Sequence, residues 1–186
     1  MQGKNQYSEI AVEYKKSKML PFRTESETPT FMKLLGDNLG DKNIVDFACG
    51  EGFYTRKIRD ISSGRVMGVD ISPEMIELAQ RQQGPEAQIE YIVQDCCKNE
   101  FTDKYAEKFD DVTATFLLNY ATQEKMIQSF TDGAFRVLKP GGRLIGINTN
   151  PFLSTRSDFE ASHEYSIKYT TDKETCEEGD PLHIHI

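Results

Sequence analysis

The chain has 186 residues, with 22 basic and 30 acidic side chains, a formal net charge of −8, and 38% hydrophobic residues. This length suits one domain with a core large enough to need no disulfide or metal. The acidic balance argues against a protein that mainly neutralises nucleic-acid phosphates, and no apolar run approaches the roughly 20 residues that span a bilayer. The first residues lack the apolar block of a signal peptide, so we expect a cytoplasmic protein.

Helices and strands alternate along residues 28–150. Thr28 as N-cap and Gly40 as stop frame the first predicted helix, and Ser72 with Pro73 begins another. Periodicity and apolar runs predict strands over 43–48, 65–70, 89–94, 109–117 and 143–148, and helices over 53–61, 73–83 and 123–138. The pattern predicts an α/β fold, a Rossmann-like, doubly wound, mostly parallel sheet with helices on both faces, which binds ligands at the carboxyl ends of its strands.

Three regions flank and form this fold. Residues 1–27 are expected to be a lid on the acceptor side, and residues 28–150 the ligand-binding core. Residues 151–186 carry eight acids and three bases, and we expect an acidic cap segment there, with a possible sixth strand over 181–186.

A glycine turn follows the first predicted strand. Gly50 and Gly52 stand between strand and helix, where glycine lets the backbone approach a ligand and the helix amides can receive an anion. A turn that needs glycine only for tightness would look the same.

Acidic residues end the next two strands. Asp70 is placed where a carboxylate accepts hydrogen bonds from ribose hydroxyls, although a solvated loop aspartate is the rival interpretation. Ile71 could pack on an adenine, and Asp95 with the backbone of Cys96 could meet the adenine edge. With Asp46, three carboxylates at three consecutive strand ends favour an adenosine ligand.

The glycine turn also discriminates between adenosine ligands. It carries Glu51, and Thr55 stands where a dinucleotide-binding turn has its third glycine. A carboxylate disfavours a pyrophosphate, whereas a ligand with an ammonium and a sulfonium suits an acidic turn. S-adenosylmethionine is such a ligand.

Five segments, 44–58, 66–80, 92–96, 109–120 and 137–148, resemble the successive motifs of class I S-adenosylmethionine-dependent methyltransferases. Within that family the chain is most similar to small-molecule enzymes of the methyltransferase-domain-25 and toxoflavin-synthase-like kind. The resemblance implies S-adenosylmethionine as cofactor and S-adenosylhomocysteine as product, and it makes the Lys139–Gly142 turn structural. Class I domains usually finish with a sixth and a seventh strand, so the terminal strand looks missing and the chain shortened.

The resemblance also implies roles for individual residues. Asp70 would bind the ribose and Phe116 would follow the fourth strand at the site. The other cofactor-binding candidates are Asp46, Ala48, Gly50 and Gly52 around the methionine moiety, Ile71 and Met75 on the adenine face, Asp95 and Cys96 at the adenine edge, and Tyr14 over the donor.

Methyl transfer is an in-line displacement that needs mainly alignment, so few residues need be catalytic. Tyr14, Tyr120 and His163 are weak candidates; Tyr14 could equally pack on the core, and His163 could be a plain surface histidine. We expect a small-molecule methyl acceptor, no nucleic acid, no membrane, and a monomer or homodimer.

Other functions stay open at this point. The alternatives are a non-catalytic methyltransferase-like binding or activator domain, a nicotinamide-dependent dehydrogenase, and a nucleic-acid or protein acceptor. The four cysteines include the adjacent pair Cys96 and Cys97 but no C-x-x-C spacing, so we expect reduced thiols and no metal site.

Overall fold

The computed structural model describes residues 20–148, 168–170 and 183–185. The chain forms two compact units, residues 34–149 and a second unit of residues 1–33 with 150–186. Within the described residues, no helix has both the length and the apolar character to cross a membrane.

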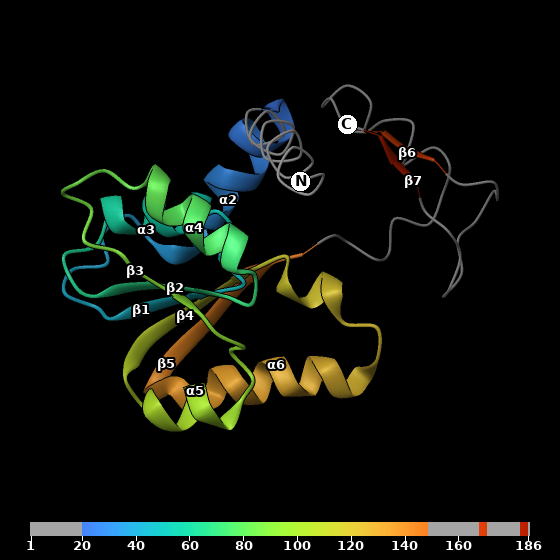
Figure 1. Ribbon diagram of the computed structural model, residues 1–186. Coiled ribbons are helices and arrows are strands. Elements are labelled where there is room, and N and C mark those ends of the chain that lie inside the picture. Colours follow the sequence, from blue (N-terminus) through green and yellow to red (C-terminus); the bar gives the residue numbers. More distant parts are fainter. Residues whose placement is uncertain (1–19, 149–167, 171–182, 186) are drawn as a thin grey trace, which may run out of the picture. The chain divides into compact units, whose positions relative to one another are not determined.

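The larger unit is a five-stranded parallel sheet in the order β3-β2-β1-β4-β5 (Figure 1). Figure 1 shows α3 and α4 on one face of the sheet and α5 and α6 on the other, so the predicted fold class is confirmed. In chain order the elements are β1 (Ile44–Phe47), α3 (Phe53–Asp60), β2 (Val66–Asp70), α4 (Pro73–Gln82), β3 (Glu90–Val93), α5 (Asn99–Lys104), β4 (Phe109–Thr115), the 3-10 turn η2 (Leu117–Tyr120), α6 (Glu124–Val137) and β5 (Leu138–Ile147).

This order places a switch point beside β1. The chain moves from β1 through β2 to β3 on one side and then returns to place β4 on the other side of β1. Because the connections diverge there, a crevice forms at the carboxyl ends of β1 and β4, and ligands of doubly wound sheets bind in that crevice.

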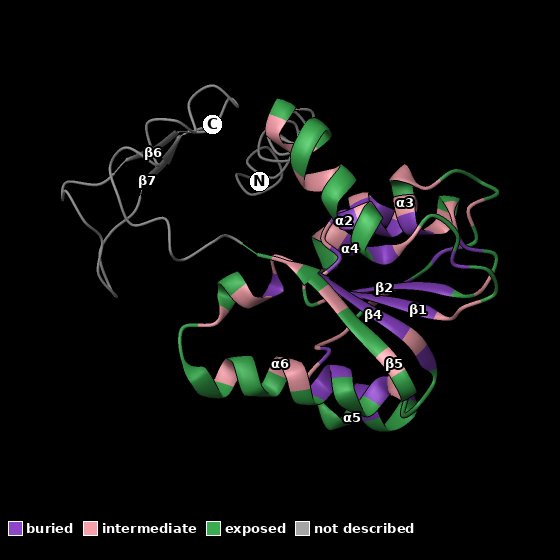
Figure 2. Ribbon diagram, turned by 180° about the vertical axis from the view of Figure 1, so that it is seen from behind, coloured by how far each residue is buried: buried purple, intermediate pink, exposed green. Residues whose placement is uncertain are grey.

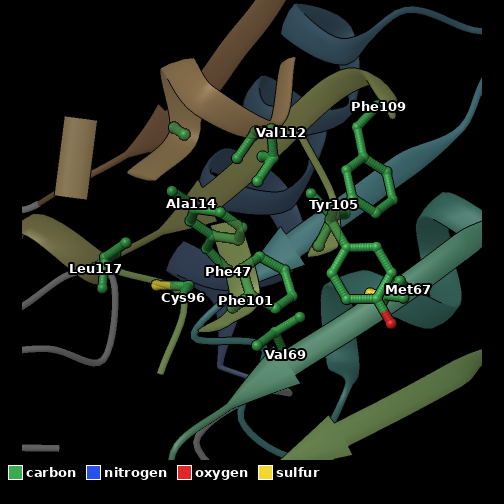
Figure 3. Close-up of a cluster of buried hydrophobic side chains, with 13 residues drawn as sticks. Phe47, Met67, Val69, Cys96, Phe101, Tyr105, Phe109, Val112, Ala114 and Leu117 are labelled. Atoms are coloured by element: carbon green, nitrogen blue, oxygen red, sulfur yellow. The ribbon is translucent and has the colours of Figure 1, made fainter. Parts of the chain in front are cut away.

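The core lies mainly between the sheet and the α5–α6 layer (Figure 3). Phe47 of β1 meets Phe101 of α5 edge to face, with ring centroids 5.8 Å apart. All four residues of β1 are buried, whereas β5 is half-exposed along its length (Figure 2). The short helix α5 was not expected from the sequence, because six residues with one apolar side chain show no periodicity.

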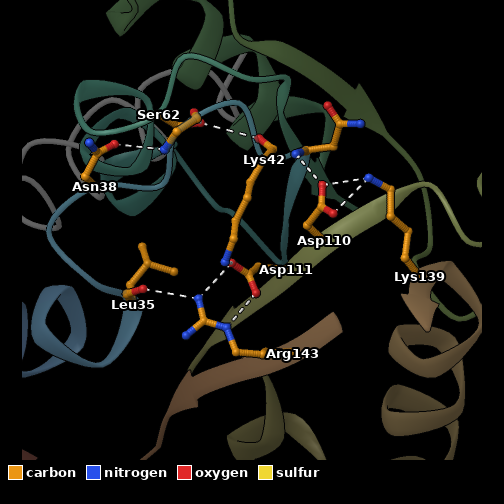
Figure 4. Close-up of polar contacts among 10 residues, drawn as sticks. Leu35, Asn38, Lys42, Ser62, Asp110, Asp111, Lys139 and Arg143 are labelled. Atoms are coloured by element: carbon orange, nitrogen blue, oxygen red, sulfur yellow. Dashed lines mark hydrogen bonds and ion pairs between the residues drawn. The ribbon is translucent and has the colours of Figure 1, made fainter. Parts of the chain in front are cut away.

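The amino-terminal ends of β4 and β5 are joined by ion pairs (Figure 4). Arg143 donates two hydrogen bonds of 2.8 Å to Asp111, which also pairs with Lys42 at 3.1 Å. Burial by itself would raise the pKa of the Asp111 carboxyl, but hydrogen bonds and charges from Arg143 and Lys42 outweigh it and hold that pKa below its usual value. Lys139 pairs with the more exposed Asp110.

Two predicted boundaries are wrong. A π-helix, η1 (Phe22–Glu27), runs directly into α2 (Thr28–Leu35), and Thr28 has helical angles (φ −64, ψ −48) rather than those of an N-cap. Helix α2 also ends before Gly36, whose φ is +108, and not at Gly40, because the nearer glycine already supplies the left-handed turn.

The Lys139–Gly142 segment belongs to β5 rather than preceding it. Between the pairs Phe109–Leu138 and Asp111–Arg143 the strand β4 advances two residues while β5 advances five. Gly141, with φ +82, allows this bulge, so the predicted turn is accommodated inside the strand.

The smaller unit contains two described strands, β6 (Lys168–Thr170) and β7 (His183–His185). They pair with each other antiparallel in a separate two-stranded sheet. A strand therefore forms within 181–186 as expected, but it does not become the sixth strand of the main sheet.

Candidate functional site

The turn after β1 holds three left-handed residues within five positions. Ala48, Gly50 and Gly52 have φ values of +52, +55 and +78. A Cβ at Gly52 would overlap the Tyr91 hydroxyl, so glycine is required there for space as well as for conformation. Ala48 has a side chain and is therefore strained in the left-handed conformation that glycine adopts freely. Such backbone strain in a non-glycine residue concentrates at functional sites.

Asp70 at the end of β2 is bound directly to this turn. The Gly50 N–H donates to Oδ2 at 2.8 Å, and the Ser72 N–H donates to Oδ1 at 2.9 Å. The half-buried carboxylate thus fixes the glycine turn against the start of α4, and each oxygen retains acceptor capacity for a ligand hydroxyl. The prediction that Ser72 caps α4 is confirmed, because its Oγ accepts from the Met75 N–H at 3.2 Å.

Apolar side chains flank this carboxylate. Ile71 is 72% exposed and Met75 is half-buried in the first turn of α4. An isoleucine left so open beside a polar carboxylate provides a surface on which a flat apolar ring can pack, as the sequence predicts for adenine.

Asp95 follows β3, and its side chain is held by a hydrogen bond within the turn that contains it. The Cys97 N–H donates to its Oδ1 at 2.9 Å, and the Gln94 N–H donates to the Asp70 carbonyl at 2.9 Å, which ties the ends of β2 and β3 together. The Cys96 side chain is 7% exposed and belongs to the core cluster (Figure 3). Only the backbone of Cys96 could therefore contact a ligand at the adenine edge.

The adjacent thiols contact each other, with their sulfur atoms 3.8 Å apart. The hydrogen bond to Cys97 and burial raise the pKa of the Cys96 thiol. The same hydrogen bond lowers the pKa of the Cys97 thiol, against the opposing effect of burial.

Asp46 differs from the other two strand-end carboxylates, because it is enclosed. It is 1% exposed, and the hydroxyls of Thr55 and Thr113 donate to its two oxygens at 2.6 and 2.7 Å. Asp46 thus joins β1 to α3 and β4 beneath the glycine turn. Of the three carboxylates expected to face a ligand, Asp70 and Asp95 are partly exposed, whereas Asp46 is enclosed beneath the turn.

Thr113 was missed because a threonine inside an apolar strand gives no sequence signal. Thr55 had been noted only for replacing a glycine.

The expected acidity of the turn is wrong. Glu51 is 4% exposed, and Arg56 of α3 pairs with its carboxylate at 2.9 Å while also donating to its carbonyl at 2.6 Å. The negative charge that was expected to repel a pyrophosphate is therefore neutralised within the protein, since α3 places Arg56 one turn and a half beyond Glu51.

Phe116 lies at the carboxyl end of β4, on the other side of the crevice. It is left-handed, with φ +61, and its N–H donates to the Ile147 carbonyl at 2.7 Å. The Asn148 side chain accepts from the Leu118 N–H at 3.2 Å, so β5 holds the loop after β4. Tyr120 at the end of η2 is 72% exposed.

Tyr14 and His163, the other candidate catalytic residues, lie outside the described residues.

Comparison with known proteins places this arrangement among methyltransferases. Residues 44–142 match the family described as "Methyltransferase domain", a stretch that begins at β1 and ends within β5. The chain is 35% identical over 127 residues to the demethylmenaquinone methyltransferase of Lactococcus lactis subsp. lactis, covering 64% of this chain and 46% of that protein. It is 30% identical over 138 residues to the mitochondrial ubiquinone biosynthesis O-methyltransferase of Mus musculus, covering 72% and 34%.

The fold likeness is also seen in a solved structure. An S-adenosylmethionine-dependent methyltransferase from Mesorhizobium loti superposes with a TM-score of 0.57 at 26% identity, over 69% of this chain and 56% of that one. The chain spans about half the length of the Lactococcus protein and about a third of the mouse protein.

Proposed function

Because the chain belongs to the methyltransferase-domain family, we propose that it transfers a methyl group from S-adenosylmethionine to a small-molecule acceptor. The observation that carries this proposal is the Asp70 carboxylate at the end of β2, held 2.8 Å from the Gly50 amide in the turn after β1, next to the switch point of the sheet. A carboxylate fixed there, with acceptor capacity remaining, is suited to a ribose.

Donor binding would use the residues along three strand ends. Asp70 would accept from the ribose hydroxyls, Ile71 and Met75 would pack on the adenine, and Asp95 with the Cys96 backbone would meet its edge. The left-handed turn from Ala48 to Gly52 would bring backbone amides to the methionine moiety, above the enclosed Asp46. Phe116 would contact the donor from the end of β4, and Tyr14 is the candidate that the family resemblance implies over the donor.

The bound donor supplies a methyl group already activated on a sulfonium. The task of the chain is then alignment, since holding two reactants in line can replace acid–base chemistry as the main source of rate. For this, Asp70 accepts from the Gly50 N–H within the glycine turn, and Asp46 accepts from Thr55 and Thr113 on the elements beside it. Tyr120 and His163 remain candidates for the acceptor side.

Several features support a small organic acceptor. The relatives named above are a demethylmenaquinone methyltransferase and an O-methyltransferase of ubiquinone biosynthesis. The net charge of −8 is unfavourable for a phosphate backbone. We further propose that the chain acts in the cytoplasm, away from membranes, as a monomer or homodimer.

Calorimetric titration with S-adenosylhomocysteine tests the proposal. We expect micromolar binding that Asp70→Asn weakens by about 10- to 100-fold, because the new amide group cannot satisfy both backbone donors and the ribose. Asp60→Asn is the matched control: it removes the same charge from an exposed position at the end of α3 and should change affinity less than about twofold.

Two further arms decide between the alternatives. NAD should give no heat, and binding of NAD in place of S-adenosylhomocysteine would identify a dehydrogenase instead. Incubation with S-adenosylmethionine and a panel of hydroquinones and phenols should release S-adenosylhomocysteine. Tight binding with no turnover of any acceptor would favour the non-catalytic domain.

A further inference from the structure

The turn after β3 brings three metal-binding side chains together. The ligand atoms of Asp95, Cys96 and Cys97 all lie within 4.8 Å of one another. Sequence spacing gave no hint of this, because zinc motifs usually separate cysteines by two or more residues. Here the turn itself brings adjacent side chains to one side.

We propose that Asp95, Cys96 and Cys97 form a binding site for a thiophilic divalent cation of the Zn²⁺ or Cd²⁺ class. The sulfur atoms are 3.8 Å apart. Two thiolates bound at about 2.3 Å to one tetrahedral zinc are themselves about 3.8 Å apart, so both sulfurs can bind one ion with little movement.

The carboxylate is also held ready. The Cys97 N–H donates to Asp95 Oδ1 at 2.9 Å, which fixes the side chain over the same turn. Two thiolates and a carboxylate make three protein ligands and leave a fourth position for water, the arrangement of an open zinc site. Soft sulfur ligands select zinc-like ions over Mg²⁺ or Ca²⁺.

An ion can reach this turn from outside. Cys97 lines a cavity of about 520 Å³ between the start of α5 and α6, together with Ser129 and Asn99. On the other side Cys96 faces the apolar core (Figure 3), and an apolar surround on one side limits the access of water to the site.

The local charges fit an ion with these ligands. A divalent cation with two thiolates and one carboxylate carries a net charge of −1. Lys125, Arg136 and Asp132 line the same cavity, and Arg136 already pairs with Asp103. Lys125 and Lys98, the residue after Cys97, are then the cations that can balance the complex.

The site would also affect donor binding. Asp95 and the Cys96 backbone are the residues placed at the adenine edge, so a bound cation should weaken binding of S-adenosylhomocysteine. This consequence rests on the proposed function, whereas the metal site itself does not.

Titration of the full chain with Cd²⁺, followed by the sulfur-to-cadmium charge-transfer absorption, tests the site. Binding of one equivalent is expected, and Cys97→Ser should weaken it at least tenfold. Cys176→Ser is the matched control, an identical change at a cysteine about 80 residues further along the sequence, and should leave affinity and stoichiometry unchanged. Asp95→Asn, which keeps both thiols, should weaken binding about tenfold. Mg²⁺ should not compete.

The outcomes separate the possibilities. Circular dichroism of the partly exposed Cys97→Ser variant confirms that it is folded before its affinity is compared. Equal Cd²⁺ affinity in wild type and Cys97→Ser, or a loss in Cys176→Ser as large as in Cys97→Ser, would overturn the proposal. The Cd²⁺ absorption needs no donor, so a failed S-adenosylhomocysteine titration would count against the function and not against the metal site.

Discussion

The hydrogen bond from Thr113 to Asp46 offers a sharp test of how the site is supported. The Thr113 hydroxyl donates to a carboxylate that is 1% exposed, at 2.7 Å. Thr113→Val keeps the shape of the side chain and removes that donor. A hydrogen bond to a charged group contributes about 1.5–3 kcal/mol, so we expect the free energy of unfolding to fall by about 2 kcal/mol.

Thr102→Val is the matched control for this change. Thr102 is also 0% exposed, but its hydroxyl has no hydrogen-bond partner among the described residues. Removing an unsatisfied buried hydroxyl should leave stability unchanged or raise it by up to about 1 kcal/mol. Strand propensity cannot produce the expected difference, because valine is at least as favourable as threonine in the strand that holds Thr113.

Urea and thermal unfolding, both monitored by circular dichroism, measure the two variants. For a chain of this size, about 2 kcal/mol corresponds to a fall of about 4–8 °C in Tm for Thr113→Val, with little change for Thr102→Val. Because Asp46 holds the glycine turn, Thr113→Val should also weaken S-adenosylhomocysteine binding severalfold. Equal losses of stability in the two variants would refute the role given to the Asp46 hydrogen bonds.

Three further changes test other parts of the structure. Arg143→Gln should lower stability at pH 7 by about 1–3 kcal/mol, whereas Lys139→Gln, beside the more exposed Asp110, should cost less than about 1 kcal/mol in the same urea assay. The folded pKa of Asp111 is lowered beneath an unfolded value of about 3.9. The stabilisation by this carboxylate is therefore present at neutral pH and is lost as the pH falls through the folded pKa. Between pH 5 and 3 the wild type should lose more stability than Arg143→Gln, and parallel pH profiles would contradict this. Gly52→Ala should reduce both stability and donor affinity, since alanine would be strained at φ +78 and would meet the Tyr91 hydroxyl. Tyr91→Phe, which removes the hydroxyl that a Cβ at position 52 would meet, should partly rescue Gly52→Ala in thermal unfolding.

The central strands and α4 could be predicted because their signals are local. An apolar run of four to five residues suffices for β1 and β2, and Ser72 with Pro73 determines where α4 begins. The position of Asp70 at a strand end follows from the same pattern. Its hydrogen bond to Gly50 does not, because the two residues meet only when β1 and β2 pair.

The wrong predictions share a physical cause. Glu51 was predicted to carry a free charge because the sequence does not show that α3 places Arg56 beside the Glu51 carboxylate. The enclosure of Asp46 was likewise not predicted, because its two threonine donors come from α3 and β4. In each case a partner distant in the sequence, or on the next element, decides whether a charged group faces a ligand or is used inside the protein.

The two ends of the sheet differ in their polar contacts and in their roles. At the amino-terminal end, buried Asp111 is satisfied by Arg143 and Lys42, and Gln88 and Glu107, just before β3 and β4, are also left-handed. At the carboxyl end, Ala48 and Phe116 are held left-handed, and strain of about 1–2 kcal/mol per residue persists only where surrounding contacts determine it fully. At Phe116 that contact is the hydrogen bond from its N–H to the Ile147 carbonyl. Around Ala48 the hydrogen bonds of Asp46 and Asp70 hold the residues on either side, so a loss of the Asp70 bond should relax the glycine turn before it unfolds the sheet. Substitutions at Asp70 should therefore change donor affinity more strongly than global stability, and substitutions around Asp111 should show the reverse.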